Sequence, residues 1–147
     1  MADRKVQLVR SACAPLLERR LKTASTAFDK NSLVEFASGV MNPSDDNDTV
    51  VHGIILEEVA STDSDYATTG SNGGKQVQIL QAGDEVEIDF SGGAITAGTA
   101  YGISNAYNVD TLDTTNKVFT CLADLSGGAT SGRCRGVFKT TLGSNNM

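Results

Sequence analysis

The residue types that could carry out chemistry are few and scattered in this chain. His52 is the only histidine, and no recognisable nucleophile motif surrounds it. A histidine inside a strand is usually packed or hydrogen-bonded, and we predict that role for His52. Glu85, Glu87 and Asp89 alternate along one strand face, where paired carboxylates can do acid–base work, although a polar outer face produces the same pattern. The sequence therefore predicts that the protein is not an enzyme.

Metal and redox sites are also poorly supported by the sequence. Cys13, Cys121 and Cys134 show no CxxC spacing and have no partner histidines, which excludes a Cys/His zinc site. Cys121 and Cys134 fall on two late candidate strands and could form a disulfide, but we favour buried, reduced thiols. The acidic residues 45–48 lack the glycine and the closing glutamate of a calcium-binding EF-hand loop, so a solvated turn is favoured over a metal site.

Two glycine stretches have the spacing of a phosphate-binding loop. Residues 93–98 are followed by Thr99 where a lysine is required, and residues 127–132 are followed by Arg133. Neither stretch lies between a strand and a long helix, so neither can direct helix N–H groups at a phosphate. Tight β-turns explain both stretches, and we predict no nucleotide and no other cofactor.

Charge divides the chain unevenly at residue 22. Residues 1–22 hold six bases and two acids, whereas residues 23–147 hold six bases and sixteen acids, and all fifteen glycines follow the division. We name residues 1–22 the N-terminal arm and residues 23–147 the body. The net charge of −6 argues against nucleic-acid binding by the body, because such binding needs clustered lysine and arginine.

Targeting and membrane signals are not visible in the sequence. The apolar runs are far shorter than the roughly 20 residues that span a bilayer. The N-terminus carries charges but no apolar segment of a secretory signal. We therefore expect a soluble protein made in a reducing cytoplasm.

The N-terminal arm combines apolar and basic side chains that it cannot bury by itself. Pro15 interrupts a continuous helix, so we expect an extended stretch followed by about two helical turns. The apolar residues need a neighbouring surface, and the arginines can pair with carboxylates of a partner. The predicted partner-binding residues are Arg4, Val6, Leu8, Val9, Arg10, Leu16, Leu17, Arg19, Arg20 and Leu21.

The first half of the body shows the patterns of short β-strands. Residues 33–40 predict two strands joined by a turn at Ser38-Gly39. Residues 49–59 form the most apolar run of the chain, which indicates a central strand. Residues 60–75 contain almost nothing apolar and predict a long exposed loop.

The second half of the body continues the same pattern. Residues 76–80 and 85–90 alternate on either side of the QAGD turn and predict a β-hairpin. Further strands are expected at residues 100–103, 117–122 and 133–141. About seven or eight short strands predict an all-β fold, a small antiparallel β-barrel, β-tulip or sandwich that follows the extended N-terminal arm.

The stretch SLVEFASGVMNPSDDNDTVVHGIILEEV, residues 32–59, resembles the capsid decoration proteins of tailed bacteriophages, also called cement or head-stabilisation proteins. Such proteins often open with a short strand pair ending in glycine, a polar loop, and a strand with a Gly-Ile or Gly-Val step. The matching segments here are Leu33–Gly39, Asn42–Asp48 and Val50–Val59, with the step at Gly53-Ile54. A glycine-and-threonine turn before an aromatic residue, at residues 97–101, is also similar.

The resemblance implies a small β-barrel or tulip-like domain that assembles as a homotrimer. It implies a place at local threefold or quasi-threefold axes of an icosahedral shell, where the protein clamps neighbouring major capsid subunits after the shell expands. We therefore expect a structural virion protein on the outer capsid surface, whose partners are the major capsid protein and other copies of itself, with no nucleic acid and no membrane. The alternative is a head-fibre or carbohydrate-binding adhesion module, with residues 62–75 and Tyr66 as its candidate patch.

Overall fold

The computed structural model of the protein describes residues 5–70 and 73–140, and these residues form eleven β-strands and no helix. The predicted all-β class is therefore confirmed. More strands are present than the sequence predicted, because short segments pair without a long alternating pattern. In chain order they are β1 (Val6–Arg10), β2 (Leu16–Arg20), β3 (Ser32–Ala37), β4 (Val40–Pro43), β5 (Gly53–Ile55), β6 (Lys75–Ile79), β7 (Glu85–Ser91), β8 (Ala100–Asn105), β9 (Asn108–Asp110), β10 (Phe119–Asp124) and β11 (Gly132–Phe138).

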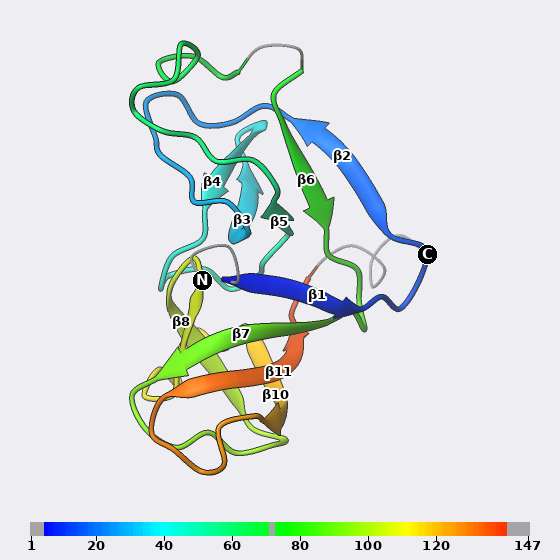
Figure 1. Ribbon diagram of the computed structural model, residues 1–147, viewed down its shortest axis with the longest axis vertical. Coiled ribbons are helices and arrows are strands. Elements are labelled where there is room, and N and C mark those ends of the chain that lie inside the picture. The colour runs from blue at the N-terminus through cyan, green and yellow to red at the C-terminus, as the bar shows by residue number, and fades with distance from the viewer. Residues whose placement is uncertain (1–4, 71–72, 141–147) are drawn as a thin grey trace.

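Six of the strands form a sheet that closes into a barrel, in the lower half of Figure 1. Its order is β1-β7-β11-β10-β8-β9, and β9 also pairs with β7 in parallel, so five strands make a closed ring. β1 and β9 share one edge of β7, since β1 pairs with residues 85–88 and β9 with residues 89–91. We call this unit the barrel.

The other five strands form a second sheet, in the order β2-β6-β5-β3-β4. β3 and β4 are a hairpin, and the predicted turn at Ser38-Gly39 is confirmed. Its two central residues have φ values of 55° and 82°, the left-handed pair that a type I′ turn requires. The sheet curls so that Lys22, just after β2, forms a bridge with Met41 of β4. We call this unit the curled sheet.

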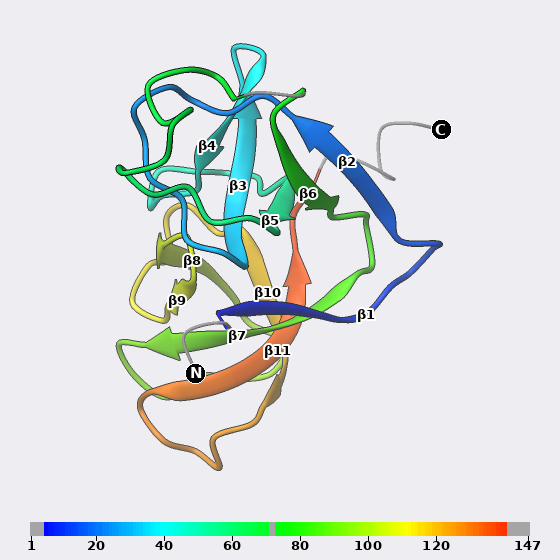
Figure 2. The same cartoon turned by 45° about the horizontal axis from the view of Figure 1, so that its top comes forward.

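The N-terminal arm runs along both units. β1 pairs with β7 of the barrel and β2 pairs with β6 of the curled sheet, both in antiparallel fashion (Figure 2). The arm and residues 75–88 therefore form one long ribbon that bends where it passes between the units. Asp84 holds the bend, because its carboxylate accepts hydrogen bonds from the backbone N–H of Ala12 (2.7 Å) and of Gln81 (2.9 Å).

The predicted hairpin of residues 76–80 and 85–90 is wrong. β6 and β7 are strands, as expected, but they belong to different sheets and do not pair with each other. The turn between them carries the chain from the curled sheet to the barrel. The physical reason is the arm, which pairs with both strands and is tied to the turn by Asp84.

The predicted helical turns after Pro15 are also wrong. Residues 16–20 pair with β6 over the whole length of β2, in a register that sets Leu16 opposite Ile79 and Arg20 opposite Lys75. A helix of two turns is marginal on its own. Pairing with an existing strand satisfies the backbone and turns Leu16 toward the core of the curled sheet.

The apolar run at residues 49–59 is central, as predicted, although its regular strand is short. β5 lies between β6 and β3, in the middle of the curled sheet. The flanks of the run pair elsewhere. The N–H of Val51 donates to the carbonyl of Lys139, just after β11, and Val59 bridges to Phe28. The run therefore joins the curled sheet to the barrel.

Two clusters of buried side chains form the core. The larger cluster fills the barrel with residues such as Ile88, Phe90 and Phe119, and it reaches the curled sheet through Leu33 and Ile54. The smaller cluster lies within the curled sheet. Its buried members are Phe28, Val34, Met41, Ile55, Val59, Val77 and Ile79.

Lys22 organises the residues that follow β5. Its side chain is completely buried, and Nζ donates hydrogen bonds to the backbone carbonyls of Asp65 (2.9 Å), Tyr66 (3.1 Å) and Thr68 (2.6 Å). The predicted loop at residues 60–75 is a series of turns in its described part, and β6 begins at its last residue. Its described residues are exposed or half-exposed except Gly74, as predicted, and the lysine anchors its backbone.

Candidate partner-binding surface

Strand pairing buries part of the predicted partner-binding set of the N-terminal arm. Val6 is 1% exposed, Leu8 packs against the larger cluster, and Leu16 packs against the smaller one. The expectation that Val6 contacts a partner is therefore corrected, because β1 directs its side chain into the protein's own core. Leu8 and Leu16 are half-buried, and their contact with a partner stays a prediction. Arg4 lies outside the described residues.

Three apolar residues of the arm remain exposed. Val9 is 40% exposed, Leu17 51% and Leu21 41%. Successive side chains of a strand point to opposite faces, so the pairing that buries Leu16 turns Leu17 outward. We call the exposed apolar and basic residues of the arm the outer arm surface. They are Val9, Arg10, Leu17, Arg19 and Leu21. Arg20 shares the face of Leu16, and its guanidinium lies over the ring of Phe36, 4.6 Å from the centroid.

The arginines of the outer arm surface already have partners within the chain. Exposed ion pairs of this kind are weak, about 0 to 1 kcal/mol, because water screens them. A partner's carboxylates could therefore replace the intrachain acids at little cost. The pairs on this surface are Arg10–Glu85 at 3.2 Å and Arg19–Glu57 at 3.4 Å, and on the opposite face of β2 Arg20 pairs with Glu18 at 2.7 Å.

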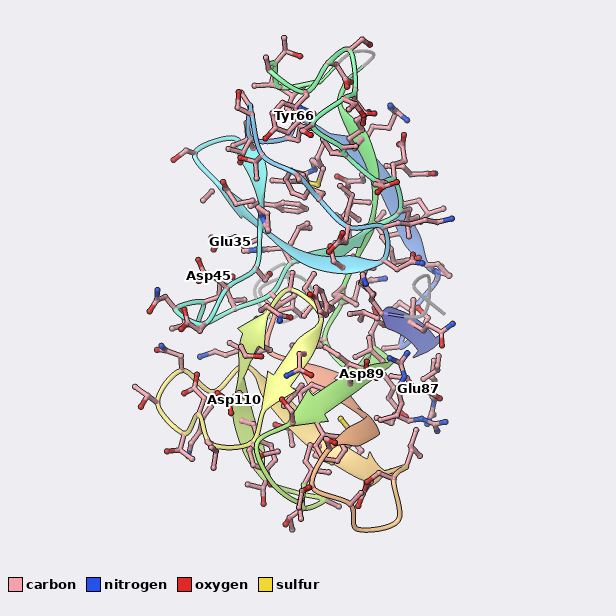
Figure 3. The ribbon with its side chains drawn as sticks, turned by 60° about the vertical axis from the view of Figure 1, so that its left-hand side comes forward. Glu35, Asp45, Tyr66, Glu87, Asp89 and Asp110 are labelled. Carbon is pink, nitrogen blue, oxygen red and sulfur yellow. The ribbon has the colours of Figure 1, made fainter. Side chains whose placement is uncertain are left out.

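The alternating acids of β7 form a charged outer face with β11 (Figure 3). Arg133 lies 3.2 Å from Asp89, and Arg135 lies 3.4 Å from Glu87. Arg133 also donates to the carbonyl of Lys5 in the arm, at 2.7 Å. These carboxylates are thus engaged in cross-strand ion pairs, which agrees with the polar outer face that their alternation predicted.

His52 is packed and hydrogen-bonded, as predicted. Its Nδ1 accepts a hydrogen bond from the backbone N–H of Phe36 at 3.0 Å, and the two rings stack with centroids 5.1 Å apart. Burial lowers the pKa of His52, and the nearby Arg20 adds to that effect, whereas Glu35 opposes it. The imidazole therefore has a structural role, as a neutral acceptor in the curled sheet.

The acidic turn at residues 45–48 is held by its own side chains. The N–H of Asp45 donates to the carboxylate of Asp48 at 3.1 Å, and the N–H of Asn47 donates to that of Asp45 at 2.9 Å. Asp48 is nearly buried, and burial together with Glu35 raises its pKa to about 7. Glu35 and Asp45 lie on the same side of the curled sheet (Figure 3). Within the described residues, no group of three or more acids, histidines or cysteines is arranged to hold a metal ion.

The three cysteines are free, and the two late ones are buried, as favoured from the sequence. Burial raises the pKa of the Cys134 thiol to about 12 and also raises that of Cys121. Both thiols therefore stay protonated and behave as small apolar groups of the barrel core. Cys13 is exposed at the bend of the arm.

The remaining sequence candidates have local structural roles. Residues 93–98 end in a turn, as predicted, in which the N–H of Thr99 donates to the carbonyl of Thr96 at 3.2 Å. Residues 127–131 instead belong to the longer loop between β10 and β11. Tyr66, the aromatic residue of the candidate carbohydrate patch, packs against the smaller cluster, and its hydroxyl donates to the carbonyl of Ser25 at 2.9 Å. The ring of Tyr66 is therefore part of the packing of the curled sheet.

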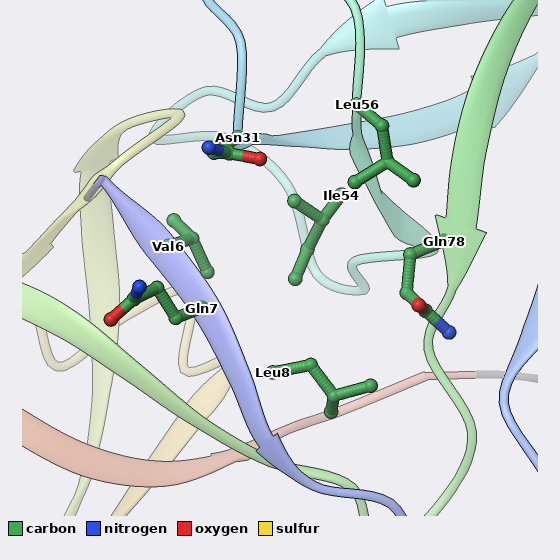
Figure 4. A pocket seen from close by; sticks show the side chains of 7 residues that line it. All are labelled: Val6, Gln7, Leu8, Asn31, Ile54, Leu56 and Gln78. Atoms are coloured by element: carbon green, nitrogen blue, oxygen red, sulfur yellow. The ribbon is translucent and has the colours of Figure 1, made fainter. Parts of the chain in front are cut away.

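One feature of the molecule was not predicted, a pocket of about 240 Å³ where β1 separates from the curled sheet (Figure 4). Four apolar side chains and three amides line it, and none of the lining residues is charged. The walls come from four separate segments, so no local pattern in the sequence indicates it. The residues that line the pocket are Val6, Gln7, Leu8, Asn31, Ile54, Leu56 and Gln78.

Comparison with known proteins identifies no relative of this chain: no protein family model, no curated protein and no solved structure matches it. The described residues include no helix of the length and apolar character that would let it cross a membrane.

Proposed function

We propose that this protein is a structural virion protein that binds the outer surface of an icosahedral phage capsid. It acts as a homotrimer that stabilises the shell by clamping neighbouring major capsid subunits. The observation that carries the proposal is the outer arm surface, where Val9, Leu17 and Leu21 are exposed beside the ion-paired Arg10 and Arg19. The resemblance of residues 32–59 to capsid decoration proteins supplies the identity of the partner.

The outer arm surface is preorganised for binding. Its backbone is held by β6 and β7, so docking does not have to order a free chain. Burying one such apolar side chain contributes roughly 1.5 to 3 kcal/mol. Three copies of a weak surface in one trimer then act at a high effective concentration, which converts modest contacts into firm attachment.

The arginines contribute to register and to the rate of association more than to affinity. Arg10 and Arg19 each exchange an intrachain carboxylate for one on the capsid, so the net gain per pair is small. We therefore expect capsid binding to slow at high salt, while the bound complex is held mainly by the apolar residues.

Point substitutions test the proposal better than removal of the arm. Deleting residues 2–22 would remove β1 and β2 and leave β6 and the first half of β7 without a neighbour on that edge. The triple variant Val9→Ser, Leu17→Ser and Leu21→Ser keeps the pairing. We expect it to fold normally and to lose at least about tenfold in affinity for expanded capsids, measured by co-sedimentation.

The matched control changes exposed leucines of the barrel instead of the arm. Leu122 and Leu125 are 45% and 46% exposed, close to the values of the arm residues. The variant Leu122→Ser and Leu125→Ser should bind capsids as the unmodified protein does. Equal binding by all three proteins would refute the role of the outer arm surface, and no binding by the unmodified protein would refute the proposed function.

A further inference from the structure

We propose that the main-chain carbonyls of Asp65, Tyr66 and Thr68 form a binding site for a primary ammonium ion, which Lys22 fills from within the chain. A free alkylammonium ion takes its place when the Lys22 side chain is shortened. The site lies between β5 and β6, and it is independent of the proposed capsid function.

The geometry around Nζ of Lys22 matches the donors of an ammonium group. Nζ lies 2.9 Å from the carbonyl oxygen of Asp65, 3.1 Å from that of Tyr66 and 2.6 Å from that of Thr68. An ammonium group on a side chain has three N–H donors and no acceptor, so one donor is available for each carbonyl. An alcohol has a single O–H donor and would leave the other carbonyls without a partner. The site is therefore selective for an ammonium ion over a neutral molecule of the same size.

The surroundings of Nζ also suit a cation. Main-chain carbonyls direct partial negative charge at it, as do the carbonyls that line cation-selective filters. Asp65 contributes its carbonyl to Lys22, whereas its carboxylate lies 3.2 Å from Nζ of Lys75. Because Lys22 is completely buried, water competes little for the three N–H groups.

The loop has further contacts that do not involve the Lys22 side chain. The main-chain N–H of Lys22 donates to the carbonyl of Thr69 at 2.9 Å, and the N–H of Ser25 donates to that of Tyr66 at 2.7 Å. The Tyr66 hydroxyl donates in return to the carbonyl of Ser25 at 2.9 Å. These bonds keep the carbonyls of the site in place when position 22 is changed. A substitution there removes the occupant of the site and leaves its oxygens.

The substitution Lys22→Ala leaves a space that fits one particular ion. It removes the atoms from Cγ to Nζ, which together are those of propylammonium. Because the side chain is enclosed by the protein, its removal leaves a cavity that the neighbouring residues fill only in part. Propylammonium in this cavity restores both the apolar contacts of the side chain and the three hydrogen bonds.

Chemical rescue of Lys22→Ala tests the site. The variant is refolded with propylammonium chloride, so that entry into the cavity does not limit binding, and its thermal unfolding is recorded. We expect Lys22→Ala to unfold at least about 5 °C below the unmodified protein. We expect about 0.1 M propylammonium to recover at least about half of that difference, since a ligand that binds only the folded state stabilises it.

Two additives and two proteins serve as controls. Propanol has the size but not the donors of propylammonium, and sodium chloride supplies the same ionic strength, so neither should recover more than a small part of the loss. Lys22→Met fills the cavity with an apolar chain and should not respond to propylammonium, nor should the unmodified protein. Equal recovery with all three additives, or no recovery with propylammonium in a folded Lys22→Ala protein, would overturn the proposal.

The unmodified protein provides a second measurement that does not depend on the folding of a variant. The ammonium protons of Lys22 should exchange slowly enough to appear in a nitrogen–proton correlation spectrum at neutral pH, with couplings to the carbonyl carbons of residues 65, 66 and 68. The ammonium protons of the exposed Lys30 and Lys139 should exchange too fast to be seen. If Lys22→Ala does not fold with any additive, this spectrum decides, and absence of the Lys22 signal refutes the site.

Discussion

The barrel and the curled sheet each bring the ends of a β-sheet together, but to different extents. In the barrel, β9 pairs with β7 over three residues, so a strand pair closes the ring. In the curled sheet, β4 meets the residues after β2 at one bridge, where the N–H of Met41 donates to the carbonyl of Leu21 at 2.8 Å and the N–H of Thr23 donates to that of Met41 at 2.9 Å. Lys22 of this bridge is buried, and its ammonium bonds three carbonyls of residues 65–68. A ring closed along its strands has little room for added atoms, whereas the single bridge depends on the residue that anchors it to the loop. The barrel should therefore be sensitive to added volume and the curled sheet to loss of a charge.

The largest effect is expected from added volume in the barrel. A Cβ atom on Gly136 of β11 would overlap the carbonyl oxygen of Thr120 and the ring of Phe119. We expect Gly136→Ala to lower the free energy of unfolding by roughly 4 kcal/mol, measured by urea denaturation. Gly98→Ala is the control: its Cβ would meet nothing within 4 Å, so its positive φ alone should cost about 1 kcal/mol. Equal losses would show that crowding is not the cause.

The next effect is expected from the lysine of the curled sheet. Lys22→Met keeps the length of the side chain but leaves the carbonyls of Asp65, Tyr66 and Thr68 without their donor. We expect a loss of roughly 3 kcal/mol, with faster amide hydrogen exchange concentrated in residues 60–70. The exposed Lys30→Met should change stability by less than about 0.5 kcal/mol. A uniform increase in exchange over both units would contradict the local role of Lys22.

The smallest effect is a pH dependence of the curled sheet. Because the pKa of Asp48 is raised to about 7, the folded protein holds this proton more tightly than the unfolded chain. Its contribution to stability is therefore complete at about pH 4, declines as the pH rises to about 7, and is then constant. Asp48→Asn should remove this decline and make the variant roughly 2 kcal/mol more stable than the unmodified protein above pH 7.

Comparison of two variants isolates the Asp48 contribution. Other carboxylates titrate in both proteins, so the difference in unfolding free energy at each pH reports on Asp48 and on its interaction with Glu35. Asp46→Asn changes an exposed neighbour and should leave the pH dependence as it is. If Asp48→Asn were no more stable than the unmodified protein at pH 8, the buried proton would have no role in the curled sheet.

The sequence patterns predicted the structure correctly where it depends on residues that are close together in the chain. The turn at Ser38-Gly39 was predictable because a two-residue hairpin needs residues that accept positive φ. The packed role of His52 followed from its place in an apolar run. The alternation in β6 and β7 correctly indicated strands, since side chains on the two faces of a strand meet different environments.

Predictions failed where distant segments compete for the same strand edge. Residues 76–80 and 85–90 pair with the arm instead of with each other, although the arm lies at least 55 residues away in the chain. The same competition replaced the expected helical turns by β2, buried Val6, and packed Leu8 and Leu16 against the two core clusters. The pocket could not be predicted, because its walls come from four segments that meet in the folded protein.

The sequence by itself determined the all-β class, the uneven charge of the two parts, and the positions of the local turns. These depend on side-chain alternation, on composition and on φ preferences, which act between near neighbours. The tertiary structure decided that the N-terminal arm is part of both sheets, that Lys22 is buried under a loop, and that a pocket lies where β1 separates from the curled sheet. The physical reason is that strand pairing and burial depend on which distant segments offer a free edge or an apolar face.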